Sequence, residues 1–173
     1  MIKFFINLVA FYWMIVLYLI HNSMYVLENK YIAVVIYIIF GFTISAYSLY
    51  KLILVTYEKE AVNLKIEKIN PAYTEYMPIF LAIAVIAFEL NSFGTDDFSI
   101  IMISIFIYLL FYMSNIAYIN PAWYLFGYRV YKIEKESADY VLIMHKNENY
   151  KSIKNVKKIY KVDEYTFIKR KEK

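Results

Sequence analysis

Residue types that usually carry chemistry are sparse in this sequence. It has no cysteine, so thiolate nucleophiles, disulfides and cysteine metal ligands are absent. The only two histidines, His21 and His145, lie far apart in the chain, and no H-E-x-x-H pattern is present. There is also no glycine-rich phosphate loop and no nucleophile elbow. We therefore expect no catalytic site, no metal site and no cofactor, and a protein that is not an enzyme.

Basic residues near the C-terminus are the main binding candidates. Lys151, Lys154, Lys158 and Lys161 are three or four residues apart, so they would share one face of a helix. Such a face is solvated charge, a contact with anionic lipid, or a docking surface for protein or nucleic acid. Nearby tyrosines do not favour nucleic acid, because the chain has 20 of them. We expect these lysines and Arg129 to contact a partner or lipid, without direct binding of nucleic acid.

The elements that must position these residues are strongly apolar. Hydrophobic residues make up 61% of the chain and the mean hydropathy is +0.45, above a typical soluble domain. Since a helix needs about 20 apolar residues to cross a bilayer, the sequence predicts a transmembrane domain in residues 1–125. Its four spans are expected at about residues 4–20, 31–54, 78–93 and 98–119. A signal peptide is the rival interpretation of the first span, but its apolar core is long and no A-x-A-like cleavage pattern follows.

Polar residues within the spans have competing explanations. Glu89 is either a functional intramembrane carboxylate or a side chain that reaches the interface, and we expect the latter. Small polar residues of the second span serve either helix packing, which we expect, or the lining of a pore. These residues are Gly41, Thr43, Ser45 and Ser48. In the third span, Pro78 is expected in the first turn, where its missing N–H costs nothing.

The distribution of Lys and Arg predicts the orientation. Residues 119–173 carry 13 basic and 7 acidic residues, a net charge of +6, whereas residues 1–118 carry 6 basic and 8 acidic, a net charge of −2. Cytoplasmic segments carry the excess of Lys and Arg. The abundance of Ile, Lys, Asn and Tyr is typical of an AT-rich bacterial genome. We therefore expect a multi-pass protein of the bacterial inner membrane with both termini in the cytoplasm.

Residues 126–173 predict a small α+β domain rich in antiparallel strands. Strands are expected at residues 128–133, 139–144 and 163–168, with a helical piece at 151–161. Residues 58–70 are expected to be the exposed end of the second helix, which the Asn-Pro pair stops. Because about 45 residues make a marginal independent fold, the domain should rest on the membrane, the span ends or a partner.

An aromatic segment joins the last span to the first strand. Asn120-Pro121 is a helix-boundary signal, Gly127 permits a bend, and Trp123 and Tyr128 have the amphipathic rings that suit headgroup depth. These five residues predict a hinge at the membrane interface.

The N-P-x5-G-Y-x-x-Y pattern of residues 120–131, between a fourth span and a β-rich tail, resembles the KwaA family, the membrane subunit of the Kiwa anti-phage defence system. The layout agrees over the whole chain, while the motif covers only these residues. The resemblance implies a four-span homo-oligomer, with a tetramer as a plausible size, and no catalytic residue. It also implies KwaB, a soluble DNA-binding effector recruited at the cytoplasmic face, where the loop and tail of this chain would meet it. The net +6 charge of the tail departs from the family pattern that the resemblance implies.

We therefore expect a component of anti-phage defence that senses infection at the envelope and recruits a KwaB-like effector to suppress phage replication. The lipid bilayer is its expected environment. Two other classes stay open on the residues alone. One is a small pore that depolarises the membrane, and the other is an immunity-type membrane protein that binds a toxin or its receptor.

Overall fold

The computed structural model describes residues 2–89, 97–113, 118, 120–135, 138–146 and 155–170. The chain forms two compact units, a helical unit of Met1–Ser48 and Glu75–Asn120 and a sheet unit of Leu49–Thr74 and Pro121–Lys173. The chain passes from one unit to the other after Ser48, Thr74 and Asn120, so three covalent connections join them.

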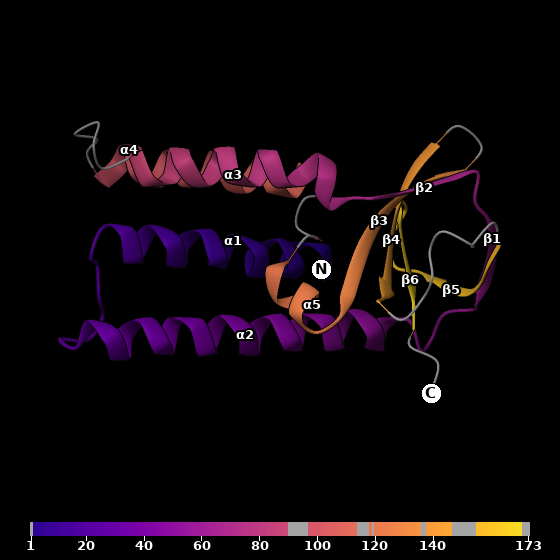
Figure 1. Cartoon of the computed structure of the whole chain (residues 1–173), viewed down its shortest axis with the longest axis horizontal. Helices are drawn as coiled ribbons and strands as arrows, with labels where there is room; N and C mark the ends of the chain where they lie inside the picture. The colour runs from indigo at the N-terminus through magenta and orange to yellow at the C-terminus, as the bar shows by residue number, and fades with distance from the viewer. Residues whose placement is uncertain are drawn as a thin grey trace. The chain divides into compact units, whose positions relative to one another are not determined.

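Four long helices are shown in Figure 1, namely α1 (Ile2–His21), α2 (Lys30–Val55), α3 (Tyr73–Glu89) and α4 (Asp97–Met113). Local signals set the ends of the first two. The backbone of Ser23 takes φ 55° and Met24 N–H bonds the Leu19 carbonyl at 2.9 Å, which is the Schellman arrangement that ends a helix. The side chain of Asn29 caps α2, because its Oδ1 accepts the N–H groups of Tyr31 and Ile32 at 3.1 and 3.3 Å.

Aromatic side chains pack α1 against its neighbours. The ring of Tyr108 on α4 lies edge-on to Phe4 and Phe11, at 5.9 and 5.7 Å between centroids. On another face of α1, the Trp13 ring approaches Gly41 of α2, where an added Cβ would lie 2.9 Å from the indole. Gly41 therefore permits a close helix approach, which supports packing as the role of the small residues.

The lengths of the helices distinguish α1 and α2 from α3 and α4. Within the part of the chain that the structure describes, α1 and α2 are long and apolar enough to cross a membrane, and α4 contains a shorter apolar helix, Ile101–Leu110. The 17 residues of α3 and of α4 correspond to about 26 Å at 1.5 Å per residue. The third helix begins at Tyr73, so the expectation that Pro78 lies in its first turn is wrong. Pro78 is the sixth residue of α3 and has no N–H group, so one backbone hydrogen bond of the helix interior is missing.

The sheet unit contains six strands and a short helix. These are β1 (Val62–Lys65), β2 (Lys68–Pro71), α5 (Pro121–Leu125), β3 (Tyr128–Lys135), β4 (Ala138–His145), β5 (Asn155–Lys161) and β6 (Thr166–Lys169). The strand order is β1-β5-β6-β4-β3-β2, so β1 and β2 form opposite edges of the sheet. Only two residues separate these edge strands, which brings Lys65 and Lys68 within about 11 Å of each other. The sheet must therefore curl until its two edges approach (Figure 1).

The core of the curled sheet follows the two-residue period of its strands. Tyr131 and Ile133 alternate along β3, and Leu142 and Met144 along β4; all four are buried in one apolar cluster. The other members of this cluster are Leu64, Ile66, Ile159 and Phe167. In β4, Val141 and Ile143 are buried as well, so four consecutive residues of this strand lie inside the protein.

Two expectations for the polar segments are wrong. Residues 58–70 do not continue α2, which ends at Val55; they contain β1 and most of β2, whose partners are β5 and β3. Residues 155–161 form β5 and not a helix, because they pair on both sides, with β1 and β6. Four of the five neighbouring pairs are antiparallel, as expected, and β4 and β6 run parallel. The predicted third strand, residues 163–168, is present as β6 and starts three residues later.

Candidate functional site

A buried polar cluster lies where the helical unit ends. The Ser45 hydroxyl accepts hydrogen bonds from Trp13 Nε1 and from Asn120 Nδ2, each at 3.1 Å. Ser45 and Asn120 have exposed fractions of 0% and 2%. Since a buried polar group left without its bond costs about 1–3 kcal/mol, this cluster fixes Asn120 relative to α1 and α2. The asparagine of the predicted hinge is therefore anchored to the helices.

The next residues form α5, in which Pro121 is the first helical residue. Proline suits this position, because its missing N–H would have no partner within the helix. The Trp123 side chain is buried and does not offer its ring to an interface; Tyr124, Leu125 and Phe126 are exposed instead.

The bend after α5 is made by Gly127. Its φ of 87° lies in the left-handed region, and an added Cβ would be 2.9 Å from His145 Nε2. Its carbonyl accepts the N–H of Lys146 at 2.7 Å, which extends the pairing of β3 with β4. Tyr128 follows, with its ring edge-on to His145 at 5.5 Å. Burial, and to a lesser extent the Tyr57 hydroxyl, raise the pKa of Tyr128.

The guanidinium of Arg129 is held against α5. It stacks on the Tyr124 ring at 3.3 Å and donates to the carbonyls of Tyr124 and Tyr128 at 2.6 and 3.1 Å. These carbonyls lie at the C-terminal end of the short helix and just after it, where a cation satisfies acceptors that the helix leaves unpaired. Arg129 is thus a fixed positive charge beside the exposed residues of α5.

A second arginine cluster was not predicted from the sequence. The guanidinium of Arg170 lies over the rings of Tyr160 and Tyr57, at 3.7 and 4.1 Å, and donates to Thr56 through Nε to Oγ1 at 2.9 Å and through Nη2 to the carbonyl. Lys59 adds a bond from Nζ to the Val162 carbonyl at 2.8 Å. We call Arg170, Thr56, Tyr57 and Tyr160 the arginine clamp, because they hold the C-terminal end of α2 against the sheet.

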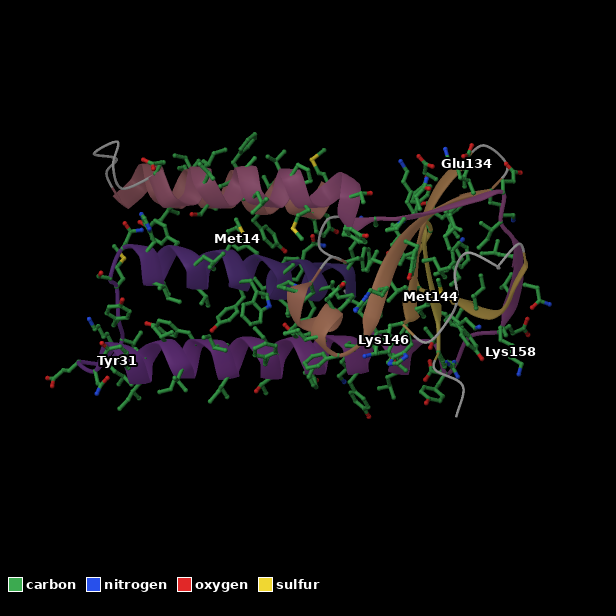
Figure 2. The ribbon with its side chains drawn as sticks, in the orientation of Figure 1. Met14, Tyr31, Glu134, Met144, Lys146 and Lys158 are labelled. Atoms are coloured by element: carbon green, nitrogen blue, oxygen red, sulfur yellow. The ribbon has the colours of Figure 1, made fainter. Side chains whose placement is uncertain are left out.

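All three connections to the helical unit converge at one end of the β3–β4 hairpin. The segment from α5 enters at Tyr128, and Tyr57 after α2 is close enough to affect the pKa of Tyr128. The Ala72 N–H, just before α3, bonds the Val130 carbonyl at 3.0 Å. Figure 2 shows Lys146 at this end of the hairpin and Glu134 at the other.

Of the predicted basic residues, Lys158 and Lys161 lie on a strand and not on a helical face. Lys158 and Lys161 lie on β5, exposed, and Lys158 takes φ 55°. Lys151 and Lys154 lie outside the described residues. Among the residues that the structure does describe, no group of three or more His, Cys, Asp or Glu side chains is arranged to hold a metal ion.

The comparison with protein families decides the classification. The family of the anti-phage protein KwaA matches residues 2–168, nearly the whole chain. The chain belongs to the KwaA family. No curated protein and no solved structure matches it. The resemblance based on the Asn120–Tyr131 motif is confirmed, and anti-phage defence is the setting in which the helices, α5 and the arginine clamp of this KwaA-family chain operate.

Proposed function

We propose that this protein is the integral membrane component of an anti-phage defence complex, which senses infection at the envelope and recruits a cytoplasmic, DNA-binding, KwaB-like effector. In this proposal four helices cross the inner membrane, both termini are cytoplasmic, and several copies form a homo-oligomer. The observation that carries the proposal is the family match over residues 2–168. The apolar lengths of α1 and α2 and the excess of Lys and Arg in residues 119–173 support the topology.

The construction of the sheet supports a coupling role. Its strands come from the segment between α2 and α3 and from the C-terminal tail, which the proposed topology puts on the same side of the membrane. The arginine clamp and the Ala72–Val130 bond tie the helix ends to this sheet. A stimulus that shifts the helices would bias the sheet between two states, and the effector would bind one of them better.

Recruitment can be tested by co-purification of the detergent-solubilised full chain with a KwaB-like effector. Deleting residues 128–173 should leave membrane insertion intact and abolish recruitment, because four of the six strands are lost. Charge reversal of two exposed cations on β5, Lys158→Glu with Lys161→Glu, should weaken recruitment. The matched control is Lys30→Glu, at the start of α2 and on the opposite side of the membrane in this topology. Recruitment that survives the deletion would refute the assignment to the sheet.

The absence of native cysteine permits a direct test of topology. Single cysteines at Tyr25 and Tyr165 should react with a membrane-impermeant maleimide from opposite sides of the inner membrane. Labelling of both from the same side contradicts the proposed topology.

The buried face of α2 argues against a pore within one protomer. Gly41, Ser45 and Ser48 are buried inside the protein, and the hydroxyl of Thr43 donates to the Ile39 carbonyl of its own helix at 2.8 Å. The burial of Gly41, Ser45 and Ser48 favours helix packing over a pore as the role of these small residues.

A further inference from the structure

A consecutive set of apolar side chains at the end of α5 and directly after it is exposed. Tyr124, Leu125 and Phe126 have exposed fractions of 53%, 69% and 38%, while Ala122 and Trp123 have 1% each. The short helix therefore buries one side and presents the other, and we call Tyr124, Leu125 and Phe126 the α5 patch. An apolar surface of this kind beside charged residues is typical of an interaction site.

Two cations flank the α5 patch. Arg129 is stacked on Tyr124, as described above, and its fixed position spares it further loss of side-chain freedom on binding. Lys146 is exposed, and its backbone N–H bonds the carbonyl of Gly127, the residue directly after the patch. Among the described residues, no carboxylate lies within ion-pair distance of either cation. Both charges are therefore available to an external anion.

We infer that the α5 patch, with Arg129 and Lys146, docks the sheet unit onto the interfacial layer of an anionic bilayer. The three apolar side chains enter the boundary between headgroups and acyl chains, to a depth of about 5–10 Å. The two cations lie at the level of the lipid phosphates, where Arg forms paired hydrogen bonds and Lys acts as a point charge. Tyr124 supplies the amphipathic ring that is enriched at this depth.

A bilayer fits this surface better than a soluble protein does. Tyr124 and Leu125 belong to a five-residue helix that starts directly after Asn120, the last residue of the helical unit, and Phe126 follows this helix. The patch is therefore only a few residues along the chain from the helices that the proposed function places in the membrane. The two cations, which have no carboxylate partner among the described residues, complement phosphate. The inference rests on the proposed function, because it requires a protein that is embedded in a membrane.

Spin labelling of the full chain in lipid vesicles tests the inference. The chain has no cysteine, so Leu125→Cys and Tyr165→Cys each carry a single nitroxide. Tyr165 is the control; it is 50% exposed and its carbonyl bonds the N–H of Val141, four residues along β4 from His145. That separation is about 13 Å along the strand. The collision rates with oxygen and with a water-soluble nickel chelate are measured in vesicles of phosphatidylcholine, with and without phosphatidylglycerol.

We expect the label at 125 to collide mainly with oxygen, as at headgroup depth, and the label at 165 to collide mainly with the nickel chelate. Replacing Lys146 with Gln should lower the ratio of bound to free patch about fivefold in the anionic vesicles, and much less in neutral ones. The charge-matched control, Lys161→Gln, should leave the ratio unchanged. Lys161 lies on β5, which β6 separates from β4, so it is two strands away from Lys146.

Three outcomes would overturn the inference. A label at 125 that is as water-accessible as the label at 165 would mean that the patch is open to a soluble partner. Shielding that disappears when the protein is diluted into excess lipid would mean that a second copy covers it. Equal effects of the Lys146 and Lys161 replacements would remove the role of the cation. Flotation with vesicles is measured on the same samples. A protein that does not float has failed to insert, which refutes the proposed function. A protein that floats but leaves the label at 125 exposed to water refutes only the docking of the α5 patch.

Discussion

Replacing Arg170 with Ala should release the C-terminal end of α2 from the sheet. The guanidinium is the centre of the arginine clamp, since it contacts the two tyrosine rings and both oxygens of Thr56. Without it, the end of α2 keeps its own bonds, from the N–H groups of Thr56 and Tyr57 to the carbonyls of Ile53 and Leu54 and from Thr56 Oγ1 to the Ile53 carbonyl. Lys59 keeps its bond to the Val162 carbonyl.

The free energy lost in Arg170→Ala can be estimated from these contacts. Each stacking contact of a partly exposed guanidinium contributes about 0.5–1 kcal/mol. The hydrogen bonds to Thr56 contribute about 1.5 kcal/mol at this partial burial, and the charge at the helix C-terminus about 0.5 kcal/mol. Ordering the long side chain opposes them by about 1.5 kcal/mol. The net loss is about 2 kcal/mol, which corresponds to about a 30-fold larger opening constant for the clamp.

Hydrogen exchange of the full chain in lipid nanodiscs measures this opening. In Arg170→Ala, the amides of Thr56 and Tyr57 should exchange about 30-fold faster than in the unmodified chain, provided that the opening is local. Amides of β4 should keep their protection. Arg170→Lys should fall between the two, because lysine keeps the charge and loses the planar fork.

Lys161→Ala is the matched control, because it removes a cation from β5 outside the clamp. If Arg170→Ala accelerates exchange at Thr56 no more than Lys161→Ala does, the clamp does not hold α2. If Arg170→Lys equals the unmodified chain, charge alone would account for the effect and the stacking geometry would not.

Three further predictions concern the junction between the units. Gly127→Ala should lower the denaturant stability of the sheet unit by about 1–3 kcal/mol, because its φ is left-handed and the new methyl group would meet His145. Asn120→Leu should cost about 1–3 kcal/mol by removing a donor from the buried Ser45 hydroxyl, and faster proteolysis after the helical unit would reveal it. The folded-state pKa of Tyr128 is raised, so its protonated phenol stabilises the fold at neutral pH and this stabilisation is lost as the pH rises through that pKa. Tyr128→Phe should therefore flatten the fall in unfolding midpoint above about pH 10, measured as a urea midpoint against pH.

The elements that the sequence predicts well are those with a local physical signal. The second helix follows from the uncharged, mainly apolar stretch of residues 31–50, and the side chain of Asn29 caps it. The β3–β4 hairpin follows from alternating bulky and basic residues at 128–133, a short polar segment, and a run of bulky apolar residues at 140–144. The strands β1 and β2 have no such signal, because each is four residues long and its partner lies far along the chain. The spacing of the lysines in β5 suggested a helix, but pairing with two neighbouring strands determines the backbone there.

The candidate site divides in the same way. Asn120, Pro121 and Gly127 were predicted from turn chemistry that acts within a few residues, and the structure gives each a defined geometry. Arg170 was missed, because in the sequence it is one cation in the basic run of residues 169–173. Only the fold brings it to Thr56, 114 positions earlier. The amphipathic ring of tryptophan suggested that Trp123 lies at the membrane interface. Its side chain is buried instead, and such burial depends on tertiary packing, which the local sequence does not reveal.

The split origin of the sheet edges has a consequence for biosynthesis. β1 and β2 leave the ribosome before α3 and α4, whereas their partners β3 and β5 leave after them. The partner of Lys68, Glu134, is synthesised 66 residues later, and the partner of Val62, Ile159, is synthesised 97 residues later. During that interval two strand edges are unpaired and open to wrong partners. The sheet is complete only when nearly the whole chain has been translated, so chains cut short before β5 lack a finished surface for an effector.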